Sequence, residues 1–195
     1  LVLSLAKLVE ARDEDTGEFW TITPAPVREN SLYTIRHGRG YSIFEHKASR
    51  SIDQKQLMFV PITDPVKIYR ISLKNNSDSI KRMSAVFYVE WVLGVNRHHT
   101  TPFIFTERDD ETGALLANNG YNEEFQGHTA FMYVNSSDYT VTCDRNEFIG
   151  RRGSIKNPSA LKKQNLSGQL GAGFDPCGAI MTKFELQPGE KKEII

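Results

Sequence analysis

The chain has 195 residues, 39% of them hydrophobic, which is enough for one domain with a sizeable core. Its 24 lysines and arginines balance its 24 aspartates and glutamates, so the sequence argues against charge-driven binding to nucleic acid or to an anionic membrane. No apolar run approaches the ~20 residues that a membrane-spanning helix needs, so we expect no direct membrane insertion.

The two cysteines, Cys143 and Cys177, lie in different segments and have neither a zinc-site nor a redox-motif spacing. We therefore expect reduced thiols and a cytoplasmic location. The chain begins with Leu1 rather than Met, and its last predicted strand stops abruptly at Ile195. From these two features we expect an excerpt of a longer polypeptide.

The first 11 residues have a mixed pattern. Leu1, Leu5, Leu8 and Val9 can form one face of a helix, but a strand over residues 7–11 fits as well, and the sequence leaves both open. The acidic segment 13–17 that follows ends in glycine, which predicts a turn. Because it lacks the ligand spacing of a calcium loop, we expect a solvated turn there.

Short runs rich in β-branched and aromatic residues, separated by Gly, Pro and Asn turns, predict strands along the whole chain. Two hairpins are expected, one across the glycines at 38 and 40 and one across residues 136–138. A change of phase between Ile68 and Tyr69 predicts a bulge or a strand buried on both faces. The predicted strands are 19–23, 32–37, 41–46, 52–61, 66–75, 80–94, 103–107, 114–117, 129–135, 139–143, 179–186 and 191–195.

The longest predicted strand, 80–94, is the one around which the rest is organised. Its odd positions from Met83 to Leu93 are all apolar and should cover a core, while its even positions mix apolar with polar residues and should be partly exposed to solvent. Glu90 is expected to face solvent or to form an ion pair; the alternative is a polar contact in a sugar-binding groove. The only predicted helix is 158–164, with Asn157 as N-cap. The sequence therefore predicts an all-β fold, a large antiparallel β-sandwich with at most one short helix.

The sequence has no self-evident catalytic machinery. It lacks a Gly-x-Ser-x-Gly elbow, and its clustered acids lie in predicted turns, where solvation rather than a tuned pKa is expected. We expect Cys143 to be a buried structural residue and the adjacent His98 and His99 to share no metal. The polar loop 118–122 is consistent with either a sugar contact or a plain turn.

A series of segments, taken in order, resembles one family. The order is similar to the N-terminal β-sandwich of the inverting glycoside phosphorylases, the group that contains cellobiose phosphorylase. The segment 64–68, Asp-Pro-Val-Lys-Ile, and the segment 88–94, Tyr-Val-Glu-Trp-Val-Leu-Gly, look most like the phosphorylase-like module of cyclic β-1,2-glucan synthases and 1,2-β-oligoglucan phosphorylases. The full series, which spans about residues 12–190, is 12–20, 36–41, 44–46, 59–61, 64–68, 88–94, 112–117, 121–122, 144–150, 166–168, 171–177 and 188–190.

The resemblance implies a supersandwich domain over residues 12–195 that precedes an (α/α)6 barrel absent from this chain; residues 1–11 do not fit it well. In the family, the catalytic aspartate and the phosphate-binding residues belong to the barrel, so no catalytic residue, cofactor site or metal site is expected here. Inorganic phosphate is then a substrate of the whole enzyme. The implied partners are a β-glucan oligosaccharide, the barrel and a second copy of the chain, in the cytoplasm or on the cytoplasmic side of an inner-membrane synthase.

The resemblance also points to a loop at the rim of a sugar-binding cleft, formed by residues 117–122. Its candidate substrate-binding residues are Asn118, Asn119, Tyr121 and Asn122. Relatives usually carry Arg and Pro where this chain has Asn118 and Gly120. The loss of the Arg removes a fork of donors suited to sugar hydroxyls or phosphate, which weakens a direct substrate role.

Three hypotheses about function follow. The first is a non-catalytic domain of a β-glucan phosphorylase or cyclic glucan synthase that supports the barrel, the cleft rim and a dimer interface. The second is a free-standing carbohydrate-binding module with contacts from Trp20, Tyr41, Trp91, Tyr121 and Asn122. The third is a purely structural or oligomerising domain.

Overall fold

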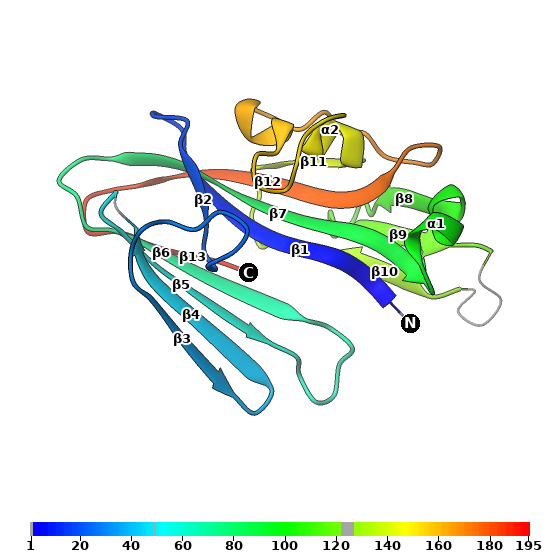
Figure 1. Ribbon diagram of the computed structural model, residues 1–195, viewed down its shortest axis with the longest axis horizontal. Coiled ribbons are helices and arrows are strands. Elements are labelled where there is room, and N and C mark those ends of the chain that lie inside the picture. The colour runs from blue at the N-terminus through cyan, green and yellow to red at the C-terminus, as the bar shows by residue number, and fades with distance from the viewer. Residues whose placement is uncertain (1, 49, 122–126) are drawn as a thin grey trace. The chain divides into compact units, whose positions relative to one another are not determined.

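The computed structural model describes residues 2–48, 50–121 and 127–195 (Figure 1). Strands dominate, in several antiparallel sheets, and this confirms the predicted all-β class. The N-terminal segment, which the sequence left open, is a strand rather than a helix. In the described part of the chain, no helix has the length and apolar character needed to cross a membrane.

The described strands form three sheets. One has the order β11-β12-β7-β1-β2, with bounds Tyr139–Asp144, Pro176–Leu186, Lys81–Gly94, Val2–Asp13 and Phe19–Thr21. The second has the order β13-β6-β5-β4-β3, with bounds Lys191–Ile194, Ile68–Asn75, Ile52–Phe59, Tyr41–Ala48 and Tyr33–Gly38. The third has the order β10-β9-β8, with bounds Thr129–Met132, Leu115–Asn119 and Ile104–Arg108.

The chain divides into two compact units. The first unit contains Leu1–Leu8 and Val86–Thr182, and the second contains Val9–Ala85 and Lys183–Ile195. Three long strands, β1, β7 and β12, begin in one unit and end in the other.

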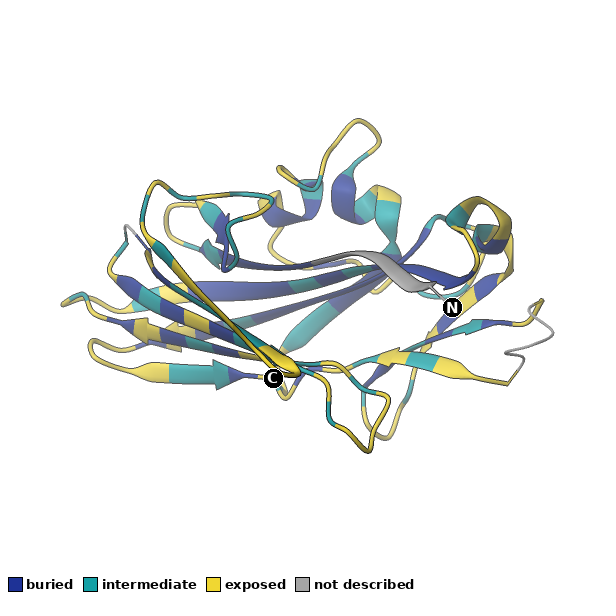
Figure 2. Ribbon diagram, turned by 60° about the horizontal axis from the view of Figure 1, so that its bottom comes forward, coloured by how far each residue is buried: buried dark blue, intermediate teal, exposed yellow. Residues whose placement is uncertain are grey.

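The second unit is built on the sheet β13-β6-β5-β4-β3. Buried and more exposed residues alternate along β5 and β6, so one face of the sheet is buried and the other is open to solvent (Figure 2). The buried face combines apolar residues such as Ile52, Ile71 and Leu73 with the polar residues His46, Gln54 and Gln56, and the open face carries the charged residues. The predicted hairpin between β3 and β4 is confirmed, with pairs from Tyr33↔His46 to Gly38↔Tyr41. The bulge expected at Ile68 is wrong, because β5 and β6 pair without interruption; Ile68 and Tyr69 are instead both half-buried.

The core of the first unit lies between β7 and the three-stranded sheet. One cluster of buried residues there is formed by Trp91, Leu93, Ile104 and Ala117. The hairpin expected between residues 129–135 and 139–143 is wrong, since β10 pairs with β9 and β11 pairs with β12. The connecting residues are tied to β12: the Thr182 hydroxyl donates to the Asp138 carbonyl at 2.9 Å. These contacts replace the tight turn that a hairpin would need.

On the even face of β7 only Arg82 is exposed, so the partly solvent-exposed face that the sequence predicts is confined to the start of the strand. In the first unit Val86, Tyr88, Glu90 and Val92 are all buried. The helical turn α2 (Arg145–Ile149) supplies the cover, because the ring of its Phe148 stacks on Tyr88 at 4.3 Å. The even face of β7 is therefore largely buried because Phe148, which is distant in sequence, covers it.

Helical turns are more numerous than the single helix expected. The predicted helix appears as the 3-10 turn η2 (Ser159–Lys162), with Pro158 rather than Asn157 at the N-cap position. Three further elements, α1 (Arg97–Thr100), η1 (Thr101–Phe103) and α2, lie in segments for which no helix was predicted. The reason is capping: Asn96 accepts from the His99 amide at 3.1 Å, and Asp144 accepts from the Asn146 amide at 2.8 Å.

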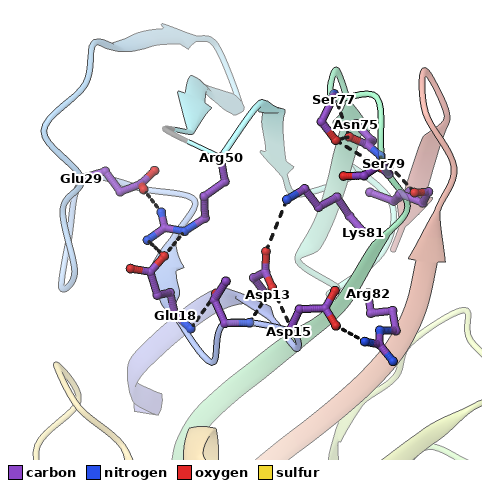
Figure 3. Close-up of polar contacts among 12 residues, drawn as sticks. Asp13, Asp15, Glu18, Glu29, Arg50, Asn75, Ser77, Ser79, Lys81 and Arg82 are labelled. Atoms are coloured by element: carbon purple, nitrogen blue, oxygen red, sulfur yellow. Dashed lines mark hydrogen bonds and ion pairs between the residues drawn. The ribbon is translucent and has the colours of Figure 1, made fainter.

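The acidic turn after β1 is tied to β7 (Figure 3). The Asp13 side chain accepts from the amides of Asp15 and Thr16, at 2.9 and 3.0 Å, and lies 3.8 Å from the Lys81 ammonium. Asp15 pairs with Arg82. The expected solvated turn is thus wrong for Asp13, which is buried. Within the described ranges, no group of three or more His, Cys, Asp or Glu residues could hold a metal ion.

Gly178 of β12 gives a first testable prediction. A Cβ atom there would lie 2.9 Å from Cζ2 of the buried Trp91 ring, which has little room to move. We expect Gly178→Ala to lower the free energy of unfolding by about 1–3 kcal/mol, the usual cost of overpacking. Urea unfolding measures the change. Gly120→Ala is the matched control, because its Cβ meets nothing within 4 Å; equal stability of the two variants would contradict the prediction.

Candidate functional site

The predicted cleft-rim loop is placed by strands β8 and β9 of the first unit. Asn118 and Asn119 are the last two residues of β9, paired with Phe105 and Ile104 of β8. The predicted polar loop is therefore part strand, and Tyr121 lies just beyond the strand end. Asn122 lies outside the described residues.

Asn119 has a structural role. It is only 9% exposed, and its amide nitrogen donates to the Leu93 carbonyl at 2.9 Å. Its amide oxygen accepts from the Tyr121 backbone at 3.1 Å. Because each end of the amide makes a hydrogen bond inside the protein and the side chain is almost wholly buried, Asn119 holds the strand end against β7 rather than facing a ligand.

Asn118 points to the opposite face of the sheet and is only partly buried. Its amide oxygen accepts from the Thr129 hydroxyl of β10 at 2.7 Å. That bond fixes the orientation of the amide, and in the described part of the chain its nitrogen has no hydrogen-bond acceptor. Two N–H donors are thus available for a sugar hydroxyl.

Tyr121 forms an exposed aromatic pair. Its side chain is 72% exposed, and its ring stacks on Phe103 with centroids 4.3 Å apart and planes 14° from parallel. Phe103 is itself 42% exposed. Stacking on a neighbour holds the ring rigidly at the surface, which suits contact with the apolar face of a pyranose.

Further aromatic side chains lie on the outer face of the three-stranded sheet. Phe105 occupies the outer face of β8, and Phe131 of β10 lies opposite Leu116 of the central strand. Tyr133 follows β10 directly. We call the five exposed rings the aromatic face: Phe103, Phe105, Tyr121, Phe131 and Tyr133. Clustered exposed aromatic residues are a frequent feature of interaction surfaces, and this makes the aromatic face a candidate site.

The sequence interpretation missed four of these five rings. The sequence did contain a signal for Phe103 and Phe105, because they alternate with Ile104 and Thr106. Since Ile104 and Thr106 are buried, the two phenylalanines must face outward. Of the aromatic contacts proposed from the sequence, Trp20 and Trp91 are wrong, since both are buried. Tyr41 is exposed but belongs to the second unit.

Two buried carboxylates stand out, but neither is placed to act as a glycosidase acid. Burial raises the pKa of Glu10 to about 8, the kind of shift that a general acid needs. Glu10 is nevertheless wholly inaccessible, and both its oxygens lack hydrogen-bond partners among the described residues. Glu90 is only 8% exposed, so it too cannot reach a glycosidic oxygen.

Glu90 is the centre of a charged cluster at the ends of β7 and β12. Its carboxylate accepts from Arg145 Nε at 2.7 Å and from the Tyr88 hydroxyl at 2.9 Å, and it lies 3.3 Å from Arg97 Nη1. Asp175 pairs with both arginines. Burial alone would raise the pKa of Glu90, but the bonds from Arg145 and Tyr88 and the charge of Arg97 lower it overall. The expected ion pair is confirmed, and its role is to fasten α1 and α2 to the sheet.

Both cysteines are buried and unbridged. Burial raises the pKa of Cys143 to about 11, with a weaker opposing effect from the Thr106 hydroxyl, so its thiol stays protonated. Burial likewise raises the pKa of Cys177. Neither sulfur has the thiolate character of a nucleophile, and this confirms that Cys143 is a buried structural residue.

Comparison with known proteins gives a consistent result. The family model described as "Glycosyl hydrolase 94, supersandwich domain" matches residues 11–195. Cyclic beta-(1,2)-glucan synthase NdvB of Rhizobium meliloti (strain 1021) is 32% identical over 168 residues, which cover 86% of this chain and 6% of that protein. N,N'-diacetylchitobiose phosphorylase of Vibrio furnissii is 30% identical over 190 residues, which cover 92% of this chain and 23% of that protein.

Solabiose phosphorylase of Paenibacillus borealis is 29% identical over 187 residues, covering 92% of this chain and 24% of that protein. The chain thus spans less than a quarter of the length of each of these three relatives. The match to the family model extends over almost all of the described fold. The chain belongs to the supersandwich domain family of glycosyl hydrolase 94.

Proposed function

We propose that this chain is the non-catalytic supersandwich domain of a β-glucan phosphorylase or a cyclic β-1,2-glucan synthase. In this role it supports a catalytic barrel, lines the rim of the sugar-binding cleft and contributes to a dimer interface. The observation that carries the proposal is the aromatic face, whose stacked Tyr121 and Phe103 rings lie at the end of β9 close to Asn118. The relatives' names, which include a β-glucan synthase and two disaccharide phosphorylases, support a carbohydrate ligand.

The proposed reaction belongs to the whole polypeptide. A carboxylic acid in the barrel protonates the glycosidic oxygen while inorganic phosphate attacks the anomeric carbon from the opposite face, with inversion. This chain's contribution is positional: the aromatic rings bind the apolar face of a sugar, and the Asn118 amide donates to a hydroxyl. The two unbridged cysteines support a cytoplasmic location.

The test is an assay of the full-length polypeptide with inorganic phosphate and β-1,2-gluco-oligosaccharides. We expect release of glucose 1-phosphate, and none from the 195-residue chain by itself. The double variant Phe103→Ala/Tyr121→Ala should raise KM by about tenfold with kcat little changed, because an aromatic contact is worth about 0.5–1.5 kcal/mol beyond its area.

Tyr41→Ala is the matched control, as it removes an exposed aromatic side chain from the other unit. Turnover by the isolated chain would refute a non-catalytic role. An unchanged KM in the double variant would show that the aromatic face is not part of the cleft rim.

The aromatic face also supports a second candidate, a free-standing carbohydrate-binding module. In that case amide signals of β8, β9 and β10 should shift when the isolated chain is titrated with β-1,2-gluco-oligosaccharides. A flat titration would leave the third candidate, a purely structural or oligomerising domain, and sedimentation at high concentration would then show whether the chain forms dimers.

A further inference from the structure

A depression of about 490 Å³ lies on the charged face of the second unit's sheet. Four lysines line it: Lys47 of β4, Lys55 of β5, Lys74 of β6 and Lys191 of β13. We call it the lysine groove. It lies wholly within the second unit and shares no residue with the aromatic face.

Strand register brings three of these lysines into one row. Lys47 is paired with Asp53, Asp53 with Lys74, and Lys74 with Lys191. Lys74 and Lys191 are therefore like charges directly opposite each other, an arrangement that destabilises a sheet.

The positive charge in this row is only partly neutralised. Lys191 pairs with Glu193 at 2.9 Å, and Lys55 pairs with Glu45 at 3.0 Å. Among the described residues, the ammonium groups of Lys47 and Lys74 have neither an ion-pair nor a hydrogen-bond partner. In a chain whose charges balance overall, this leaves a local excess of positive charge inside a depression.

The spacing of the row suits one small anion. Strands β6 and β13 are neighbours, ~4.8 Å apart, and β4 lies two strands from β6, about 10 Å away, so Lys74 and Lys191 are adjacent and Lys47 must extend across β5 to reach the same oxyanion. Lysine binds phosphate as a point charge and needs no planar geometry to do so. The row is therefore fitted to a phosphate group.

The other residues that line the groove favour a ligand that carries hydroxyl groups as well as a negative charge. Glu45 and Asp53 also line the groove, and a carboxylate repels a bare anion. A carboxylate does accept hydrogen bonds from hydroxyl groups, as do the hydroxyls of Thr34 and Ser72 in the next row. This combination fits a ligand with one anionic end and a body rich in hydroxyls, and the volume lies within the ~300–1,000 Å³ of small-molecule sites.

We infer that the lysine groove binds a sugar monophosphate, with its phosphate on Lys47, Lys74 and Lys191 and its hydroxyls on Asp53, Glu45 and Ser72. This site is separate from the proposed cleft rim. The choice of glucose 1-phosphate as probe rests on the proposed function, since phosphorolysis releases it. The groove would let the domain bind the product of the reaction outside the catalytic site.

The test is a titration of the isotope-labelled 195-residue chain with glucose 1-phosphate, inorganic phosphate and glucose, followed by amide chemical shifts. We expect shifts confined to β4, β5, β6 and β13, and binding of glucose 1-phosphate at least tenfold tighter than that of phosphate or of glucose. The double variant Lys74→Gln/Lys191→Gln should bind glucose 1-phosphate at least tenfold more weakly than the wild type. Lys162→Gln, which changes an exposed lysine of η2 outside the groove, should have no effect.

A second variant tests the sugar contacts separately. Asp53→Asn removes a carboxylate that repels the phosphate and that would accept a hydrogen bond from a sugar hydroxyl. The variant should therefore bind inorganic phosphate more tightly than the wild type does, and its affinities for inorganic phosphate and glucose 1-phosphate should differ less. Phosphate binding as tightly as glucose 1-phosphate to the wild-type chain would overturn the inference, as would binding unaffected by the double lysine variant or no shifts at all. Because this test measures binding and the proposed function is tested by turnover, either can fail without the other.

Discussion

Glu10→Gln should make the protein less sensitive to alkaline pH. The wild-type and variant chains are expected to differ little in stability near pH 4.5, and the difference should grow in favour of the variant by about 4 kcal/mol as the pH rises to 8.5. The cause is the Glu10 carboxyl, which is wholly buried and without hydrogen-bond partners among the described residues.

The sign follows from the raised pKa of Glu10 in the folded protein, about 8 against an ordinary value of 4.5. Below pH 4.5 the group is protonated in both the folded and the unfolded chain, and it costs nothing through ionisation. Between pH 4.5 and 8 the unfolded chain releases the proton and the folded chain does not, so stability falls by about 1.4 kcal/mol for each pH unit. The amide of Gln cannot ionise and removes this loss.

Urea unfolding of both chains at pH 4.5, 6.5 and 8.5 measures the effect. Other groups titrate equally in the two chains and cancel in the difference. Glu111→Gln changes a residue in an exposed turn and is the control. Its free energy of unfolding should equal that of the wild type at every pH. A constant difference between wild type and Glu10→Gln across the range would show that Glu10 is ionised in the folded protein.

Glu90→Gln is expected to destabilise the protein by about 3 kcal/mol at pH 7. The substitution removes the negative charge that faces Arg97 and Arg145 and leaves only Asp175 against the two guanidinium groups. Breaking a buried ion pair on one side typically costs ~3–5 kcal/mol, and we take the lower end because Arg145 keeps part of its hydration.

The pH dependence is opposite to that of Glu10. The pKa of Glu90 is lowered in the folded protein, so its stabilising effect is present above its ordinary pKa of 4.5 and is lost as the pH falls through the lower, folded value. The difference between wild type and Glu90→Gln should therefore shrink in acid. Glu185→Gln changes an exposed residue of β12 and should leave stability unchanged; a Glu90→Gln chain as stable as this control would show that the cluster contributes nothing.

Local pattern was enough for most strands of this fold. Period-two runs bounded by Gly and Pro located β3 to β6, and a two-strand pairing across Gly38 and Gly40 follows from the short connection itself. The pairing of β11 failed because its partner, β12, lies beyond a long irregular segment, and no local signal encodes that choice. The burial of most of the even face of β7 was not predicted for a related reason: Phe148, which stacks on Tyr88 of that face, lies far along the chain.

The candidate site was only partly predictable. The loop residues were found through resemblance, but their roles depend on contacts that sequence does not show. Asn119 and Asn118 are adjacent and chemically identical, yet one is fully engaged by Leu93 and Tyr121 and the other faces outward. The ring that supports Tyr121, Phe103, is 18 positions earlier in the chain and comes to it only because β8 and β9 pair.

The order of strands in the sheet β11-β12-β7-β1-β2 has a consequence for biosynthesis. Strands β3 to β6 pair with their sequence neighbours, so each can form as soon as it is made, at a low entropic cost of loop closure. Strand β7 ends at Gly94, whereas its neighbour β12 begins only at Pro176. During synthesis on the ribosome, one edge of the longest and most apolar strand therefore stays unpaired until residues 176–186 have emerged. That open edge makes β7 the segment of the nascent chain most exposed to pairing with the wrong partner.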